Sequence, residues 1–455
     1  MACYLSNNLA RFCSRNRVRT SRGRAVLRLL MLCLMTILPI NANASEGGAT
    51  GPVLTARAAV LLALEDNPGL AAMQHRYEAL REVPRQVGSL PDPMLNINAM
   101  NFPTDSFDRD QEGMTQLQFG FSQEFPFPGK LDLKEEAATF DAIAAGYSVD
   151  EMRVRLANSV KTTWWQIHYL DRALETLEKN KELLRQFIAV AETKYETGRG
   201  LQQDILLAQL ELSKLIEQGI SLVALRKHQS IQLNTLMDRP ASSPAALADV
   251  DISSMPGILS ETELFAIANE SRPTLKEKET QMQAALARLE LAKKDRFPDF
   301  KLGVMYGERD GDNPPFMGGS RADLFSVMFG VKIPLYAGRK QSGAISQKTA
   351  EVAKNRYALI DEKSAVRSAI ATAITDYQKS REQNELFSTG IIPQAEQTVQ
   401  SMLAAYQVSE VDFLNLVRSQ MTLFNYELLY WKSFSEANQA LSRLEAAVGR
   451  VSIYE

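Results

Sequence analysis

The feature that most constrains this chain is a long stretch without proline, residues 129–239, which has prolines close to both ends. Proline breaks the interior of a helix, so this stretch is free to be helical over most of its length. Its one strong interruption is Gly198-Arg199-Gly200, and apolar residues recur three and four positions apart on both sides of it. This spacing predicts an antiparallel helical hairpin with a coiled-coil seam. At about 1.5 Å per residue the first arm would be about 100 Å long, more than a globular domain needs.

The N-terminus has the composition of a targeting segment. Residues 1–28 hold seven arginines and no acidic residue, and the apolar run Leu29–Ile40 follows them. With Ala42-Asn43-Ala44 as the cleavage site, the pattern predicts a secretory signal peptide over residues 1–44, cut after Ala44. The alternatives are an anchor that stays attached, although the run is short for a bilayer, and lipidation at Cys33, which Leu32 disfavours.

Removal of this leader would change the cysteine content and the charge. All three cysteines lie within it, so the mature chain would have no disulfide, thiolate metal site or cysteine nucleophile. Seven of the 51 basic residues would be lost while all 54 acidic residues remain. The resulting net charge of about −10 argues against a nucleic-acid partner. No later segment reaches 18 consecutive apolar residues, so no transmembrane helix is predicted.

The order of predicted elements occurs twice, which indicates an internal duplication. The first structural repeat, residues 45–237, combines helices with two strands at 94–101 and 115–124 and a long hairpin at 130–237. Two unrelated coiled coils would not explain why the strand pair and its proline junctions recur later in the chain.

The remaining segments follow the same plan. The chain continues with an inter-repeat linker at 238–258, a second repeat at 259–449 with strands at 300–308 and 324–333 and a long hairpin at 339–449, and a C-terminal tail at 450–455. The linker is rich in proline, as expected of a connection.

The four predicted strands alternate between apolar and polar residues. In the second strand, Leu117, Phe119 and Phe121 share one face, and polar or small residues share the other. A length of roughly 9–10 residues and this alternation are typical of outer-membrane barrel strands. The alternative is a soluble sheet packed on the helices. Four strands cannot close a barrel and an open edge cannot lie in lipid, so the membrane interpretation requires an oligomer with eight, twelve or sixteen strands in total.

At this point the chain resembles the TolC-type outer-membrane efflux family over nearly all of residues 53–449. The resemblance rests on the duplication, on two strand-to-helix junctions and on two tip segments, Tyr195–Gly198 and Tyr406–Ser409. The junctions are Phe125–Lys130 and Ile333–Gly338, in which the marking residues are Pro126, Pro128, Gly129, Pro334 and Gly338.

This resemblance implies a fold class and a set of partners. The chain would be mainly α-helical with a membrane β-barrel, and a homotrimer would form a twelve-stranded barrel in outer-membrane lipid. A periplasmic α-helical tunnel about 100 Å long would extend from it. The tunnel would meet a periplasmic adaptor (a membrane fusion protein) and an inner-membrane pump of the RND type.

Some segments look most like the branch of this family found with heavy-metal resistance pumps. They are Pro91–Met94, Ser122–Lys130 and Leu324–Val327. Methionine is a soft ligand, so Met94, Met305 and similar residues suggest copper or silver sites, with filling of the barrel as the simpler explanation. The predicted function is therefore a passive exit duct for heavy-metal cations. The alternatives are a duct for drugs, a type I protein secretion channel, or a coiled-coil adaptor without a pore.

The hairpin turns would form the closed periplasmic end of the tunnel. Family channels carry acidic rings on the second repeat, and those positions fall here on Asn415 and Arg418, so this chain departs from the family pattern. Asp204, Glu410 or Asp412 could supply the negative ring instead. The alternative is that Asp204 and Asp412 only cap the helices that follow the turns.

The same turns are candidates for adaptor docking. Gly198 and Ser409 would form the turns, and Leu201, Val411 and Phe413 are predicted to be exposed apolar residues beside them. Elsewhere the sequence has no nucleophile–base pair, phosphate-binding loop or cluster of metal ligands, so we predict no catalysis, no cofactor and no resident metal.

Overall fold

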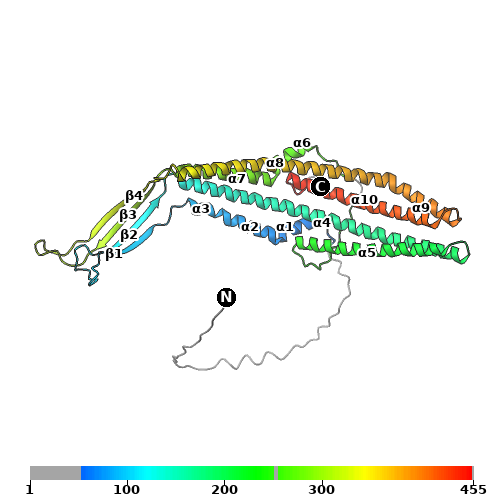
Figure 1. Cartoon of the computed structure of the whole chain (residues 1–455), viewed down its shortest axis with the longest axis horizontal. Coiled ribbons are helices and arrows are strands. Elements are labelled where there is room, and N and C mark those ends of the chain that lie inside the picture. Colours follow the sequence, from blue (N-terminus) through cyan, green and yellow to red (C-terminus); the bar gives the residue numbers. More distant parts are fainter. Residues whose placement is uncertain (1–52, 251–254, 453–455) are drawn as a thin grey trace, which may run out of the picture. The chain divides into compact units, whose positions relative to one another are not determined.

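A computed structural model describes residues 53–250 and 255–452, which belong to one structural unit. The predicted signal peptide with its cleavage site at Ala44 lies outside the described residues, as do parts of the predicted linker and tail. Figure 1 shows the strands at one end of the long helices and the hairpin turns at the other.

The first half of the unit begins with three short helices and continues with two strands and a hairpin. In chain order these are α1 (Ala56–Asp66), α2 (Pro68–Arg81), α3 (Val83–Gly88), β1 (Met94–Met100), β2 (Gln116–Phe125), α4 (Lys130–Glu196) and α5 (Gln202–Leu236). Asn67 ends α1 and caps α2 by accepting a hydrogen bond from the Leu70 N–H at 3.0 Å.

The second half repeats this order with one helix fewer at its start and an interruption in its long arm. Its elements are α6 (Glu261–Ser271), α7 (Pro273–Lys294), β3 (Asp299–Glu308), β4 (Leu324–Lys332), α8 (Lys340–Leu386), the π-helix η1 (Phe387–Ile391), α9 (Ile392–Gln407) and α10 (Phe413–Val448). The prediction of a mainly helical chain with four strands and two long hairpins is confirmed.

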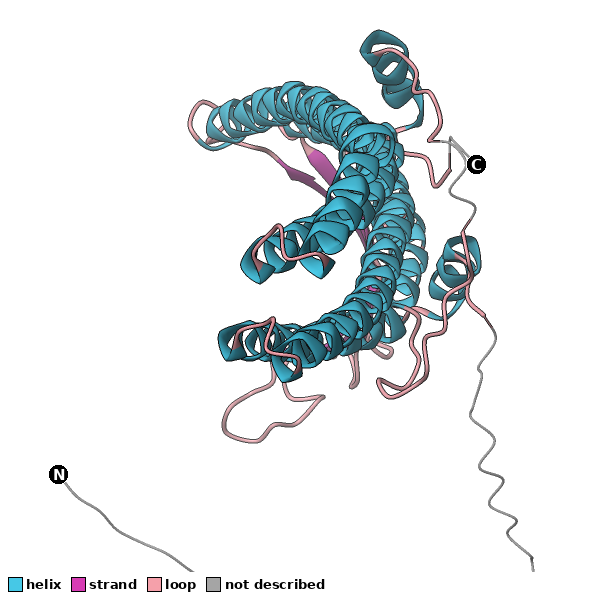
Figure 2. Ribbon diagram, turned by 90° about the vertical axis from the view of Figure 1, so that its right-hand side faces the viewer, coloured by secondary structure: helices cyan, strands magenta, loops and turns pink. Residues whose placement is uncertain are grey.

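The helices form a curved layer. Figure 2, which looks along them, shows this layer end-on. The helix α4 packs against α5, α7 and α10, and α7 packs in turn against α8. The seam between the two hairpins is apolar, with Leu177, Leu184, Leu215, Leu416 and Phe424 nearly inaccessible to solvent. Within the described residues, no helix is both long enough and apolar enough to cross a membrane.

The four strands form one antiparallel sheet in the order β1-β2-β3-β4. The halves of the chain meet at β2 and β3, where Phe119 lies opposite Tyr306. In β2 the polar side chains of Gln116, Gln118 and Ser122 are buried, whereas Phe119 and Phe121 are exposed. This is the reverse of a soluble sheet, so the sheet does not cover its apolar face with the helices of its own chain.

Candidate functional site at the hairpin turns

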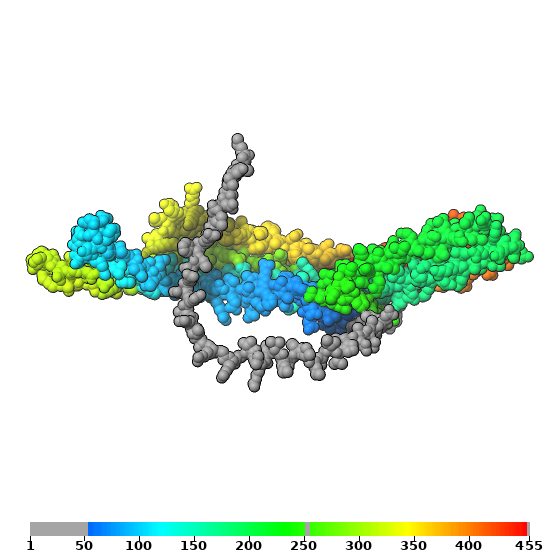
Figure 3. Space-filling model, turned by 90° about the horizontal axis from the view of Figure 1, so that it is seen from below, coloured from blue at the N-terminus to red at the C-terminus, as the bar shows by residue number. Residues whose placement is uncertain are grey.

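The turns of the two hairpins lie at the same end of the molecule (Figures 1 and 3), and they share one pattern of backbone hydrogen bonds. After α4, the N–H groups of Gly198 and Arg199 donate to carbonyls of the last helical turn, and after α9 those of Ser409 and Glu410 do the same. Gly198 and Ser409 both have positive φ, 71° and 66°. This is the hydrogen-bond pattern of a helix C-terminus closed by a left-handed residue. A non-glycine residue in this conformation is uncommon, which makes Ser409 a strained position.

A lysine from the first hairpin contacts the turn of the second. The Lys194 ammonium donates to the Tyr406 carbonyl and, at 2.9 Å, to the Ser409 hydroxyl. It also lies 4.3 Å from the centre of the Tyr406 ring, within the range of a cation–π contact. One cation thus satisfies carbonyl and hydroxyl groups at a helix end that carries partial negative charge.

Asp204 of α5 completes the contact. Its carboxylate accepts a hydrogen bond from the Tyr406 hydroxyl at 3.5 Å, a long and therefore weak bond. Burial raises the pKa of Asp204, and the nearby Asp412 carboxylate adds to the rise. Burial, and then the Asp204 charge, raise the pKa of Tyr406 to about 12, so this hydroxyl keeps its proton at neutral pH. We call Lys194, Asp204, Tyr406 and Ser409 the turn cluster.

The other predicted gate residues lie around this cluster. Glu410, Asp412, Asn415 and Arg418 are exposed to solvent. Asp412 is the residue before α10, yet its side chain makes no capping hydrogen bond. The backbone of Leu201, the residue before α5, partly offsets the rise in the pKa of Asp204, so this carboxylate lies at the helix start as well as in the turn cluster. The structure therefore brings Asp204 and Asp412 near each other, while Asn415 and Arg418 stay outside the cluster.

The predicted docking residues differ in exposure. Leu201 is 59% exposed and Val411 is partly exposed. The expectation that Phe413 is exposed was wrong, because this ring packs against the Tyr406 ring with centroids 5.1 Å apart and is only 1% exposed. Phe413 therefore fixes the start of α10 against the end of α9.

Sequence reasoning missed a buried polar contact further along the seam. The Gln420 side chain donates to the Asn180 side-chain oxygen at 2.7 Å, and both residues are inaccessible to solvent. Asn180 also donates to Glu427 at 3.2 Å. A buried polar group costs stability unless it is paired, so this contact specifies how α4 and α10 align. A single polar residue inside an apolar repeat was the available signal.

A second unusual cluster surrounds His168 of α4. All three tryptophans of the chain and Phe434 lie with ring centroids 5.5–6.1 Å from its imidazole: Trp164, Trp165 and Trp431. Neither ring nitrogen of His168 has a hydrogen-bond partner. Burial, followed by the charge of Arg172, lowers the pKa of His168 to about 4. The imidazole is therefore neutral in this cage at neutral pH.

The strand-to-helix junctions are asymmetric. At the first, Gly129 adopts φ of 82° directly before α4, which requires glycine. The ammonium of the adjacent Lys130 is buried and pairs with Asp299 at 2.8 Å. At the second junction, Gly338 has no positive φ, and Arg339 precedes α8. Pro126, Pro128 and Pro334 lie in the turns between strand and helix, where they end the strands.

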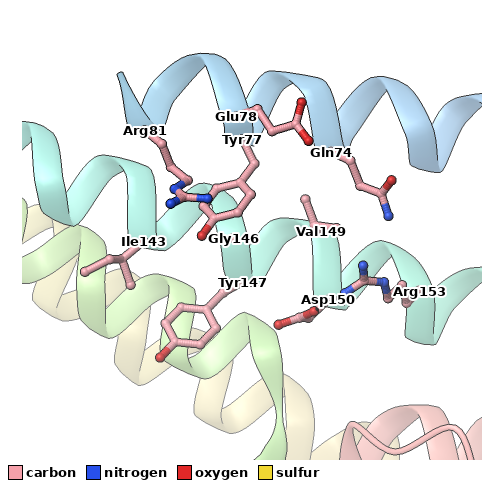
Figure 4. A pocket seen from close by; sticks show the side chains of 10 residues that line it. All are labelled: Gln74, Tyr77, Glu78, Arg81, Ile143, Gly146, Tyr147, Val149, Asp150 and Arg153. Carbon is pink, nitrogen blue, oxygen red and sulfur yellow. Dashed lines mark hydrogen bonds and ion pairs between the residues drawn. The ribbon is translucent and has the colours of Figure 1, made fainter. Parts of the chain in front are cut away.

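An open hollow of about 510 Å³ between α2 and α4 is drawn in Figure 4. The Tyr77 ring approaches Gly146 so closely that a Cβ there would lie 3.2 Å from it. The only carboxylate that α4 contributes to the lining, Asp150, is paired with Arg153 at 2.7 Å. This arrangement holds the two helices together. Across residues 53–250 and 255–452, no group of three or more His, Cys, Asp or Glu side chains could hold a metal ion.

Comparison with known proteins places these features in context. The profile of a family described as outer membrane efflux protein matches residues 59–238 and 264–450. Protein CyaE of Bordetella pertussis is 22% identical over 256 residues, which cover 56% of this chain and 53% of CyaE. The chain thus matches about half the length of this curated relative.

Solved structures of outer-membrane channels share the fold. The CusC structure superimposes with a TM-score of 0.73 at 16% identity and covers 87% of this chain and 92% of CusC. The outer membrane protein VceC of Vibrio cholerae gives a TM-score of 0.71 at 17% identity and covers 87% of this chain and 96% of VceC.

Proposed function

Because the chain belongs to the outer membrane efflux protein family, we propose that three copies of it form a passive exit duct for heavy-metal cations from the periplasm to the exterior. Membership of this family places the chain in the cell outer membrane. Transport through such a duct needs no covalent chemistry. The duct takes its cargo from an inner-membrane pump of the RND type through a periplasmic adaptor.

This proposal rests on the sheet, whose apolar side chains are exposed. One row across the four strands consists of Ile97, Phe119, Tyr306 and Phe325, and all four side chains are exposed. The next row, on the opposite face, consists of Asn96, Gly120, Met305 and Ser326. A large exposed apolar face marks an interaction surface. Lipid outside and water inside match this alternation.

Closure of the sheet requires further copies. β1 and β4 are the edge strands of the sheet, and an open edge is costly in lipid. Three copies would join into a closed sheet of twelve strands. The helix α4 has 67 residues, so the turns lie about 100 Å from the sheet at about 1.5 Å per residue. This length supports a helical tunnel that extends into the periplasm.

The turn cluster holds the two hairpins of each copy together in the closed state. Asp204 and Asp412 supply acidic groups to the gate, with Glu410 exposed beside them. Asn415 and Arg418 occupy the positions of the acidic rings of the family and give this gate a different charge pattern. An adaptor docks where Leu201 and Val411 are accessible, next to Gly198 and Ser409, with Phe413 supporting the turn from inside.

Support for a metal cargo comes from the polar face of the sheet. Met94, Met305 and Met328 all lie on it, beside the buried hydroxyl of Ser122. Thioether sulfur is a soft ligand that suits Cu(I) and, by the same softness, Ag(I). Weak and repeated contacts with such sulfur atoms suit the passage of a metal cation through the duct rather than its retention.

The assembly is tested by native extraction. The mature protein is expected in outer-membrane fractions as a trimer that resists mild detergent, and it should conduct ions in planar bilayers. Recovery as a soluble monomer would overturn the proposal.

The cargo is tested by deletion of the gene. The deletion strain should become sensitive to copper, silver, zinc, cobalt or cadmium. If only drug tolerance or the export of a polypeptide changed, the metal assignment would be wrong while the duct remained.

The gate is tested with a matched pair of variants. Asp204→Asn should weaken block of the conductance by divalent cations, because it removes an acidic group from the turn. Asn415→Asp places an acid at the equivalent position of the second hairpin and should strengthen the block. Unchanged block in both variants would assign Asp204 to helix capping alone.

A further inference from the structure

The two halves of the chain correspond closely at the ends of their strands. Pro91-Asp92 before β1 matches Pro298-Asp299 at the start of β3, and Phe125-Pro126 at the end of β2 matches Ile333-Pro334 directly after β4. The pairing of the strands supports this match independently. The partners Met94 and Ser122 correspond to Lys301 and Gly330, which are also partners. The two hairpins of strands are therefore equivalent residue by residue.

Within one chain, the junction between the halves is closed by a buried ion pair. Lys130 is the first residue of α4 and is 5% exposed. Its ammonium lies 2.8 Å from the Asp299 carboxylate. Asp299 also accepts a hydrogen bond from the Phe127 N–H at 2.9 Å. These contacts join the end of β2 to the start of β3.

The equivalent residues at the outer edges of the sheet lack these contacts. Lys340 is the first residue of α8, and Asp92 stands before β1; both side chains are exposed. Neither forms an ion pair or a side-chain hydrogen bond in the structure of the single chain, as far as residues 53–250 and 255–452 show. Lys340 and Asp92 are thus a cation and an anion at opposite edges of the sheet. Their counterparts within the chain, Lys130 and Asp299, are paired with each other.

Apolar residues repeat the same relation. Phe127 stacks on Phe297 with ring centroids 4.6 Å apart. Their equivalents are Leu335, which is 82% exposed, and Leu90, which is 50% exposed. Both edges therefore combine an unpaired charge with an uncovered apolar side chain.

We propose that β4 pairs with β1 of a neighbouring copy in the register of β2 with β3, and that Lys340 forms an ion pair with Asp92 of that copy. In this register Val327 lies opposite Ala99, Phe329 opposite Ile97 and Val331 opposite Leu95 of the neighbouring copy. The second copy is the occupant because it offers both the missing strand and the missing charge. The inference rests on the proposed trimer, and it adds the register of β4 with β1 and the ion pair between neighbouring copies.

The register is tested by disulfide cross-linking. The only cysteines of the chain, Cys3, Cys13 and Cys33, lie in the predicted leader, so introduced pairs have no competitors in the mature protein. Asn98→Cys with Met328→Cys joins two positions that the register places directly opposite each other. The matched controls combine Met328→Cys with Asn96→Cys or with Met100→Cys, which are displaced by two residues on the same face.

The expected result is a covalent trimer after oxidation of the first pair and little cross-linking of the two controls. Stronger cross-linking of either control would overturn the register while the trimer stood. A trimer without any cross-link would overturn the pairing of β4 with β1. If native extraction yields a monomer, the proposed function itself fails.

The ion pair between Lys340 and Asp92 is tested by exchanging their charges. Lys340→Glu and Asp92→Lys should each lower the temperature at which the detergent-resistant trimer dissociates. The double variant, which restores opposite charges, should recover most of that loss, because an ion pair depends on the combination and not on either residue. If the loss in the double variant equalled the sum of the two single losses, the ion pair would be overturned.

Discussion

The two hairpins end in the same turn, yet they bring different chemistry to their contact. The first hairpin supplies the charges, Lys194 and Asp204, and the second supplies the groups that these charges bind, in Tyr406 and Ser409. At the position equivalent to Asp204 the second hairpin has Asn415. The duplication thus preserved the backbone of the turn while its side chains diverged into complementary partners.

Equivalent positions also differ in burial. Tyr406 is 4% exposed, whereas its counterpart Tyr195 is 48% exposed. Gln420 is buried against Asn180, whereas its counterpart Gln209 is exposed. The first hairpin therefore covers the second at these positions and is not covered in return, and each such pair offers a variant together with its control.

The largest effect is expected from removing the buried tyrosine. Tyr406→Ala removes a ring that contacts Phe413, Lys194 and Asp204, and it should lower the free energy of local opening at the turns by about 4 kcal/mol. Tyr195→Ala should change it by less than about 0.5 kcal/mol. Hydrogen exchange of the amides at residues 194–199 and 405–410 measures both. Equal effects would mean that the two turns contribute alike.

The next effect depends on pH and on His168, whose counterpart in the second half is the exposed Gln378. Folding lowers the pKa of His168 from an ordinary 6.5 to about 4, so between these values the unfolded chain binds the proton more tightly. The stability linked to this residue is fully present above about pH 6.5 and is lost as the pH falls toward 4. The loss should reach about 3 kcal/mol at most.

Urea unfolding in detergent measures this loss through the fluorescence of the three tryptophans around His168. His168→Leu should flatten the pH dependence between 4 and 6.5, because no group in the cage then titrates. His75→Leu is the matched control, since His75 is exposed beside Glu78. A profile that His168→Leu leaves unchanged would assign the pH dependence to groups other than His168.

The helices, turns and strands could be predicted from the sequence, whereas the burial of individual side chains could not. Prolines, glycines and alternation are local signals, so the hairpins, both turns and all four strands were predictable. Which face of a long helix is covered depends on a neighbour far away in the chain. Lys130 and Asp299, for example, are 169 residues apart. For the same reason the burial of Phe413 and the choice of Tyr406 over Tyr195 were not predictable.

A smaller effect is expected at the buried polar contact. Gln420→Leu leaves the side-chain oxygen of Asn180 without its donor inside the seam and should cost about 2 kcal/mol. Gln209→Leu changes the same residue type at the equivalent exposed position and should cost almost nothing. Urea unfolding at neutral pH compares the two. If Gln420→Leu stabilised the protein, the contact would act in alignment of the helices alone, and the double variant with Asn180→Leu would then be neutral as well.

The smallest effect concerns the one place where the long arms differ in length. Lys340–Gln407 is one residue longer than Lys130–Glu196, and it contains the π-helix η1. A π-helical turn accommodates an inserted residue within a helix. Deletion of Gly390 should therefore turn η1 into α-helix and keep the turn cluster in place, at a cost below about 1 kcal/mol.

Deletion of Lys179 from the uninterrupted α4 is the control for this variant. Without a π-helical turn to absorb the change, every later residue of α4 rotates by about 100° around the helix axis, and Lys194 no longer faces Tyr406. Hydrogen exchange at the turns should then be fast in the Lys179 deletion and normal in the Gly390 deletion. If both deletions exposed the turns equally, η1 would be a required part of the contact, and the two arms would not be equivalent up to a single inserted residue.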